Sequence, residues 1–291
     1  GEDVEAKVAR SVRVLGDAVD ASAFDVLHAQ DCIAANAVDG RCVRTVHHLD
    51  TFTTPALVAC HERAVQLPPV LVCVSRQVAD EVQRSRGRTA TVVPNGVEAG
   101  RFARGDGTAW RARLGGAPLV VTVGGIEPRK GSEELVEAVA LLGPGAVLAV
   151  GGGETLWDYR AFRADVDAGA RALGVDLRVL GPLPQQEVPD LVAAADVFAL
   201  PSRKEGFGLV AMEALAAGVP VVLRDLPVFR EVFGDAVRYG TDPVSLAAAM
   251  TAPPLDPALG RALAQAHTWE AAALAHLQLY TRETHRNANV S

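Results

Sequence analysis

The chain has 291 residues, of which 49% are hydrophobic and 22% charged, a balance typical of a globular protein of one or two domains. Its formal net charge of −7 gives the surface no general attraction for phosphate backbones, which argues against nucleic-acid binding. No apolar run approaches the ~18 residues that a membrane-spanning helix needs, and the first residues do not resemble a signal peptide, so we expect a soluble protein.

All four cysteines lie in the first quarter of the chain: Cys32, Cys42, Cys60 and Cys73. No two of them form a CxxC pair, so their spacing indicates neither a disulfide framework nor a zinc site. The simplest interpretation is that they are small buried hydrophobic residues in a reducing compartment, which favours a cytoplasmic location.

In chain order, a helix-like stretch at 4–19 is followed by short β-branched runs that alternate with Ala/Leu-rich helical stretches. Near-continuous apolar strands separated by helices are typical of parallel sheets covered on both faces, which predicts an α/β fold. The predicted strands are 24–28, 43–47, 70–74, 91–93, 119–123, 147–150, 177–180, 197–200 and 219–223, and the clearest helices are 132–142, 156–173 and 209–217.

A break near residues 94–118 divides these elements into two Rossmann-like lobes. Residues 1–97 supply only four strands, which is short for such a lobe, whereas residues 98–267 supply five.

The last predicted helix covers about residues 269–281, within a segment, 268–285, that we expect to join the N-terminal lobe. Its large apolar and aromatic side chains are expected to form core rather than a membrane-binding face. They are Trp269, Leu274, Leu277 and Tyr280.

Two histidines, His47 and His48, end the second predicted strand. No Cys, His or carboxylate stands at a metal-like spacing from them, so the residues alone leave His47 as either a structural histidine or a site residue. His28 and Asp31, at the end of the first predicted strand, are further candidates of the same kind.

The segment Gly124-Gly125-Ile126-Glu127-Pro128-Arg129-Lys130-Gly131 directly follows the predicted strand 119–123. The carboxyl end of a strand is where open α/β sheets bind ligands. Lys130 supplies a compact charge and Arg129 a planar fork, both suited to diphosphate oxygens, although such a loop also occurs on ordinary surfaces.

Three glycines at 151–153 follow the next predicted strand and allow a ligand close to the backbone. They lack the spacing of a dinucleotide-binding GxGxxG turn, and the chain has no GxxxxGK[ST] P-loop. NAD enzymes and P-loop NTPases are therefore disfavoured.

The most informative segment is residues 201–220, which follows a strand and opens a helix. Glycines at its helix start free the backbone, so that the amides of Phe207, Gly208 and Leu209 are expected to point outward at the positive end of the helix dipole. This arrangement predicts an anion site suited to a diphosphate.

Glu205 and Glu213 flank this helix start at a spacing of eight. In a continuous helix they would lie roughly 12 Å apart, beyond the roughly 5–9.5 Å that separates paired glycosidase carboxylates. We therefore favour two separate glutamates that each accept hydrogen bonds from hydroxyl groups over a hydrolase pair. We also favour them over the alternative in which Glu205 only interacts with the helix dipole and Glu213 is an unrelated solvated residue.

Together these motifs resemble the retaining glycosyltransferases of family 4, which have the GT-B fold: two Rossmann-like lobes facing across a cleft. The most specific motif is Glu-x7-Glu, from Glu205 to Glu213, within EGFGLVAMEALAAGVPVV. It is joined by VVPNGVEAGRF at 92–102, VTVGGIEPRKGSEELVEAV at 121–139 and VLGPLPQQEVPDLVAAADVFALPS at 179–202, so the resemblance covers about residues 24–282.

The resemblance implies donor binding in the C-terminal lobe and acceptor binding mainly in the N-terminal lobe. By position, Lys130 matches the diphosphate lysine, Glu205 the carboxylate that holds donor-sugar hydroxyls, and Glu213 the one that holds ribose hydroxyls. The amides of Phe207, Gly208 and Leu209 match the phosphate-binding amides. Leu180 matches a residue beside the base, and His47 the cleft histidine that meets the sugar or acceptor.

Two departures from the family pattern stand out. Gly124-Gly125 replaces the usual Gly-Arg, so one phosphate-binding arginine is missing at Gly125, and Arg129 is the candidate to replace it. The family's first strand and Gly-Gly loop have no counterpart, so the N-terminal lobe looks incomplete.

The resulting expectation is a retaining hexosyltransferase that uses a nucleotide-diphosphate sugar and an unknown small-molecule, glycan or lipid acceptor. Lys130, Arg129 and the helix start are expected to stabilise the leaving diphosphate without a metal or cofactor, and no Asp-x-Asp lies where a metal-bridged diphosphate needs it. A catalytically silent sugar-nucleotide-binding subunit and a GT-B sugar-nucleotide epimerase are the alternatives.

Overall fold

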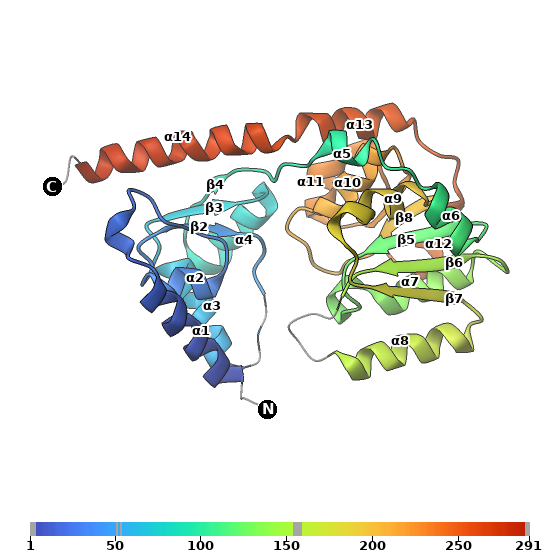
Figure 1. The fold of residues 1–291 in the computed structure, drawn as a ribbon, viewed down its shortest axis with the longest axis horizontal. Coiled ribbons are helices and arrows are strands. Elements are labelled where there is room, and N and C mark those ends of the chain that lie inside the picture. Colours follow the sequence, from blue (N-terminus) through green and yellow to red (C-terminus); the bar gives the residue numbers. More distant parts are fainter. Residues whose placement is uncertain (1–3, 51, 53, 154–158, 289–291) are drawn as a thin grey trace. The chain divides into compact units, whose positions relative to one another are not determined.

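The structure, a computed structural model, describes residues 4–50, 52, 54–153 and 159–288, with the side chains of 284–288 excepted (Figure 1). The chain forms two compact units. One comprises the residues up to Asn95 together with those from Glu270 onward, and the other comprises Gly96–Trp269.

The first unit is built on a parallel sheet in the order β1-β2-β3-β4. Strand β2 pairs with β3 so that Val43 lies opposite Val70 and Val46 opposite Cys73. The strands are β1 (His28–Ala29), β2 (Val43–Val46), β3 (Val70–Cys73) and β4 (Thr91–Val92), and the helices are α1 (Val4–Ala18), η1 (Ala21–Ala23), α2 (Cys32–Ala37), α3 (Pro55–Gln66), α4 (Arg76–Arg86) and α14 (Trp269–Ala288).

Alternation along these strands sends side chains to two apolar clusters. Val43 and Val72 pack with Ala272 and Leu279 of α14. Val46, Leu71 and Cys73 pack on the other face with α3 and α4, through Val65, Val78 and Val82. Both faces of the sheet are therefore covered, which explains why β3 is apolar throughout.

The predicted apolar face of α14 is wrong in part. Leu274 and Leu277 are 55% and 59% exposed, whereas Ala272 and Leu279 are buried. At 100° per residue, Ala272 and Leu279 share one side of the helix, while Leu274 and Leu277 lie on the other. The helix thus packs on the sheet through Ala272, Leu279 and the partly buried Tyr280. Trp269 is exposed, like the two leucines.

The second unit contains a six-stranded parallel sheet in the order β10-β9-β8-β5-β6-β7. Its strands are β5 (Leu119–Val123), β6 (Val147–Gly151), β7 (Asp176–Gly181), β8 (Val197–Leu200), β9 (Val221–Arg224) and β10 (Arg238–Gly240). Its helices are α5 (Ala99–Phe102), α6 (Thr108–Leu114), η2 (Pro128–Lys130), α7 (Ser132–Ala140), α8 (Arg160–Ala172), η3 (Gln185–Glu187), α9 (Val188–Ala193), α10 (Leu209–Ala217), α11 (Pro227–Phe233), η4 (Gly234–Ala236), α12 (Pro243–Thr251) and α13 (Pro257–Ala266).

Helices cover both faces of this sheet, with α7 and α8 on one side and α9 and α10 on the other (Figure 1). The core on the α7 side joins Val120, Leu148 and Ala199 of the strands to Leu135 of α7 and Leu246 of α12. Helix α10 buries side chains nearly all round, as expected for a helix between a sheet and other helices.

The strand order reverses at the centre of this sheet. The chain runs outward from β5 through β6 to β7, and then starts again at β8 on the other side of β5. Such a switch point opens a crevice at the carboxyl ends of the two central strands, which is where ligands bind in open α/β sheets. The loops after β5 and β8 therefore flank the expected binding position.

One strand was not expected, because β10 (Arg238–Gly240) has only three residues and little apolar character, and lies at the sheet edge. The prediction of five strands in this lobe is therefore short by one. No helix among the described residues has both the length and the hydropathy needed to cross a membrane.

Candidate functional site

The basic turn after β5 and the loop after β8 meet at the switch point. Lys130, at the end of η2, donates from Nζ to Glu205 Oε1 at 2.5 Å. Arg129 Nη1 lies 3.4 Å from the same carboxylate oxygen and donates to the backbone oxygen of Lys204 at 3.1 Å. The structure thus brings together two segments that lie 75 residues apart in the sequence.

Backbone geometry fixes this contact. Gly131 has a φ of +69°, and a Cβ there would lie 2.4 Å from the carbonyl oxygen of Pro201. The amide of Arg203 donates to the carbonyl oxygen of Arg129 at 2.8 Å. Only glycine permits both the left-handed turn and the close approach, so the two loops are held side by side.

Glu205 is a largely buried carboxylate whose side chain is 12% exposed. Burial raises its pKa, but the Lys130 ammonium, the Arg129 guanidinium and a hydrogen bond from Ser202 together lower the pKa below its ordinary value. Ser202 is fully buried and donates from Oγ to Glu205 Oε1 at 3.1 Å. The carboxylate is therefore ionised and fixed in position.

Helix α10 begins beside this carboxylate at Leu209, after Gly208 with a φ of +91°. Within the described chain, the amides of Phe207, Gly208 and Leu209 donate no hydrogen bond. The Phe207 side chain is buried and packs its ring on His267, with centroids 5.7 Å apart. Unpaired amides at a helix N-terminus favour a bound anion.

Glu213 lies one turn further along α10 and lines a separate hollow of about 300 Å³ with Glu98, Arg101, Gln185 and Leu209. Burial raises the pKa of Glu213 to about 7, with Glu98 adding to the rise and Arg101 opposing it. A carboxyl group held in this way can donate or accept a hydrogen bond near neutral pH, which suits contacts to hydroxyl groups.

The glycines after β5 and β6 bring these strand ends close together. Gly124 donates from its amide to the carbonyl oxygen of Gly151 at 2.7 Å, and a Cβ at Gly152 would lie 2.3 Å from the carbonyl oxygen of Gly124. Gly125, next along, is partly exposed. Leu180 lies near the carboxyl end of the edge strand β7, beyond β6, and is partly buried.

His47 belongs to the first unit and follows β2. Its Nε2 lies 3.0 Å from Gln30 Oε1, and Gln30 in turn contacts His28. His28 also lies 2.5 Å from the Tyr280 hydroxyl. Burial lowers the pKa of His47, so its imidazole is neutral near pH 7.

Several residues that support this site escaped the sequence analysis. Arg224, at the end of β9, donates from Nε to the carbonyl oxygen of Pro201 at 2.9 Å and pairs with Glu134 of α7. Arg224 thus holds the loop after β8 through Pro201, and Ser202, within that loop, holds Glu205. The sequence indicates Arg224 and Ser202 only through their positions, since each lies just after the end of a predicted apolar strand.

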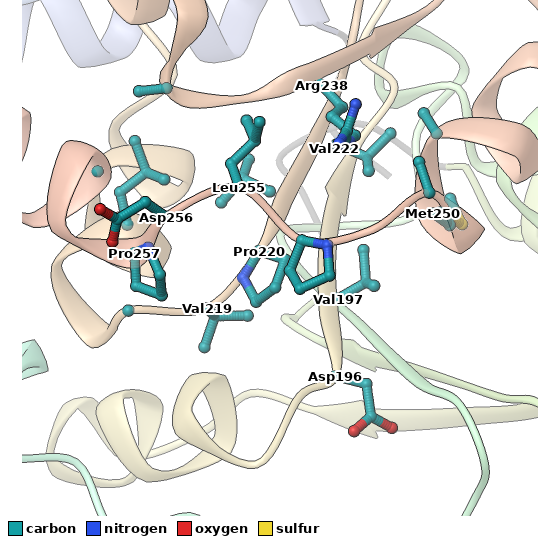
Figure 2. A pocket seen from close by; sticks show the side chains of 18 of the residues that line it. Asp196, Val197, Val219, Pro220, Val222, Arg238, Met250, Leu255, Asp256 and Pro257 are labelled. Atoms are coloured by element: carbon teal, nitrogen blue, oxygen red, sulfur yellow. The ribbon is translucent and has the colours of Figure 1, made fainter.

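A second cavity lies at the opposite edge of the same sheet, near the amino ends of β8 and β9 (Figure 2). Its volume is about 230 Å³, and Figure 2 shows Val197, Val219 and Val222 in its lining, with Arg238 beside Val222. Mostly apolar side chains line it, and it does not include Lys130, Glu205 or the start of α10. Among the described residues, no group of three or more His, Cys, Asp or Glu is placed to hold a metal ion.

The chain matches two family models. The model described as "Glycosyl transferases group 1" matches residues 110–252, and "Glycosyltransferase Family 4" matches residues 5–101. The first match lies within the second unit, and the second covers the first unit up to Asn95 and continues into the start of the second unit.

Similar proteins carry related names. The "D-inositol 3-phosphate glycosyltransferase" of Xylanimonas cellulosilytica is 32% identical over 90% of this chain and 73% of its own length. The protein of the same name from Mycolicibacterium gilvum is 32% identical over 68% of this chain. That match covers only half of the relative's length.

Solved structures share the fold. A sucrose-phosphate synthase from Thermosynechococcus elongatus superposes with a TM-score of 0.79 at 22% identity, over 96% of this chain and 79% of its own. Anabaena Alr3699/HepE in complex with UDP and glucose superposes with a TM-score of 0.75 at 20% identity, over 94% and 80%. At these identities the likeness defines the fold, which is GT-B.

Proposed function

The chain belongs to the glycosyl transferases group 1 and is a glycosyltransferase, and from this premise we propose that it moves a hexose from a nucleoside-diphosphate sugar to an acceptor with retention of anomeric configuration. The donor proposal is supported by Anabaena Alr3699/HepE, whose structure was solved in complex with UDP-glucose. The retaining outcome rests on the resemblance to family 4.

The observation that carries the proposal is the contact of Lys130 with Glu205 beside the free amides that open α10. A departing nucleoside diphosphate gains negative charge, and an ammonium with unpaired amides stabilises that charge without reorganising. The ion pair keeps each charge in place before the donor binds. We assign Lys130 and the amides of residues 207–209 to the diphosphate.

The carboxylates have separate roles in this proposal. Glu205 accepts hydrogen bonds from the hydroxyls of the transferred sugar, and Glu213 in its own hollow contacts the ribose. Leu180 and the adjoining end of β7 lie beside the base. The neutral His47 contacts the sugar or the acceptor. Because these side chains are buried at separate places, each can contact a different part of one ligand.

Arg129 is the proposed replacement for the arginine that the family carries at the position of Gly125. Its guanidinium contacts Glu205 and, at 3.7 Å, Glu127. A diphosphate offers oxygens of the geometry that an arginine fork prefers. We assign Arg129 to the phosphate furthest from the sugar bond.

Replacement of either member of the ion pair tests the proposal. Lys130→Ala and Glu205→Gln are each expected to lower kcat/KM at least a hundredfold, the scale of losing one charge-stabilising group. The measurement is turnover of the donor that most stabilises the wild-type chain in a thermal-shift screen of UDP-, GDP- and ADP-sugars. Anomeric proton NMR of the product reports retention.

Matched controls are Lys7→Ala on α1 and Glu137→Gln on α7, which remove the same charges from exposed positions. They are expected to turn over like the wild type. Near-wild-type rates for folded Lys130→Ala would refute its role at the diphosphate. Donor binding without turnover, in the wild type and with every acceptor class, would instead indicate a binding subunit.

A further inference from the structure

A buried arginine in the first unit has two nitrogen atoms without a hydrogen-bond partner in the described part of the chain. Arg44 on β2 is 4% exposed, and its Nε and Nη1 atoms have no hydrogen-bond partner among the described residues. Burying a guanidinium without an anion is costly, so this position favours a negative charge nearby. The nearby carboxylate, that of Asp31, already accepts the amide of Ala34 at 2.7 Å.

Cysteines surround this arginine. Arg44 lies close enough to all four thiols for its charge to act on each. Three of them, Cys42, Cys60 and Cys73, are buried, whereas Cys32 at the start of α2 is partly exposed. A reagent from solvent therefore reaches Cys32 most directly.

One side-chain amide ties Cys32 to Cys60. Asn36 Nδ2 donates to the backbone oxygen of Cys32 at 2.7 Å and to that of Cys60 at 2.8 Å, and lies 3.5 Å from Cys60 Sγ. Arg63 Nε donates to Asn36 Oδ1 at 3.1 Å, which fixes the orientation of the amide. Helices α2 and α3 are thus joined where they carry the two cysteines.

The surroundings favour a thiolate at Cys32 and a protonated thiol at Cys60. A hydrogen bond with Cys60 lowers the pKa of Cys32 to about 5, with His61 and Arg44 also lowering it and burial opposing. The same contact and burial raise the pKa of Cys60. His61 is itself 6% exposed, and its Nε2 has no partner within the described chain.

We propose that Cys32 and Cys60 form a redox-active dithiol, in which Cys32 attacks an external disulfide and Cys60 resolves it. The Cys32 thiolate attacks one sulfur of a low-molecular-weight disulfide, forming a mixed disulfide and releasing one thiolate. Cys60 then passes its proton to the released thiolate and attacks Cys32 Sγ, which expels the second thiolate. Two protein thiols are oxidised, and one external disulfide is reduced to two thiols.

Hydroxyethyl disulfide at pH 6.5 is a suitable probe, because an ordinary thiol is largely protonated there. The wild type is expected to lose two thiols and to give a Cys32–Cys60 disulfide in peptide mapping. Cys60→Ser is expected to stop at a mixed disulfide on Cys32, and Cys32→Ser to leave Cys60 free. Cys42→Ser, which keeps both sulfurs of the pair, is expected to react like the wild type.

The rate of alkylation reports how much of Cys32 is thiolate, which disulfide trapping alone does not measure. The rate of Cys32 alkylation by iodoacetamide against pH is expected to reach half its plateau well below pH 8 in the wild type, and at higher pH in Arg44→Gln or His61→Gln. The proposal is overturned if natively folded wild type keeps both thiols free, if another pair forms the disulfide, or if Cys32 titrates like a free cysteine. None of these readouts depends on sugar transfer.

Discussion

Glu205 illustrates how one side chain depends on its partners. Its carboxylate is almost buried, yet its pKa is low because Lys130, Arg129 and Ser202 all favour the charged form. Removing Lys130 leaves that charge with weaker compensation, so a variant there changes both stability and activity. Binding and turnover must therefore be compared in variants whose folding is measured separately.

Glu213 presents the opposite case, and it gives a prediction of pH dependence. Its pKa is near 7 in the folded chain against 4.5 for an unperturbed group. Between these values the folded state binds more protons than the unfolded state, so the free energy of unfolding falls as pH rises from about 4.5 to 7. Glu213→Gln cannot ionise and escapes this loss.

Urea unfolding at pH 5 and pH 8 checks this sign. From pH 5 to pH 8, the free energy of unfolding of Glu213→Gln is expected to rise by on the order of 2 kcal/mol relative to that of the wild type. The histidines with lowered pKa values, His28, His47 and His276, titrate in both proteins and cancel in the difference. A difference between the two proteins that does not change with pH would contradict the burial of Glu213.

At the residue scale, sequence reasoning selected the charged groups but not their contacts. Lys130 and Glu205 were both predicted as site residues, and their ion pair depends on the adjacency of β5 and β8, which no local pattern encodes. Ser202 and Arg224 were missed because a hydroxyl or an arginine after a strand has many possible partners. Their roles follow from the tertiary positions of Glu205 and Pro201.

Among the elements, strands in the interior of the second sheet were predicted most accurately. The predicted strands 119–123 and 197–200 have the bounds of β5 and β8, since β8 is buried and apolar throughout and β5 is buried and apolar over its first three residues. The predicted strand 219–223 begins two residues before β9, because Pro220 offers no amide to the ladder. The first predicted strand, 24–28, overlaps the two-residue β1 only at His28.

The short helices escaped prediction. Helix α2 has six residues and α5 four, which is too few for a periodic apolar pattern to emerge. Such helices are stabilised by caps and packing rather than by propensity. In α2, the Asp31 side chain caps the helix by accepting the amide of Ala34.

The turn between β5 and α7 gives a prediction at the element scale. Gly131→Ala places a Cβ 2.4 Å from the carbonyl oxygen of Pro201 in a backbone with φ +69°. The left-handed strain alone costs roughly 1–2 kcal/mol, and the clash with backbone adds to it. We expect a larger loss of unfolding free energy than strain explains, together with weaker donor binding.

Gly174→Ala is the matched control, because Gly174 also has φ +69° and a Cβ there meets nothing within 4 Å. It is expected to show the strain cost alone and unchanged donor affinity. Equal losses of stability in the two variants, measured by urea unfolding, would show that the approach of the Gly131 turn to Pro201 does not constrain the site.

For the whole molecule, the two sheets divide the chain as the predicted alternation of strands and helices suggested. The order β10-β9-β8-β5-β6-β7 was not contained in that alternation, because strand adjacency is a long-range property. This order places the basic turn beside the loop that opens α10. We therefore propose that this switch point binds the diphosphate of the donor.

The most direct test compares affinities for a nucleoside diphosphate and the matching monophosphate by titration calorimetry, using the base of the preferred donor. The wild type is expected to bind the diphosphate at least tenfold more tightly, as a charged hydrogen bond worth about 1.5–3 kcal/mol implies. In Lys130→Ala that ratio is expected to fall toward one, while Lys7→Ala keeps it. A ratio unchanged in folded Lys130→Ala would contradict the account.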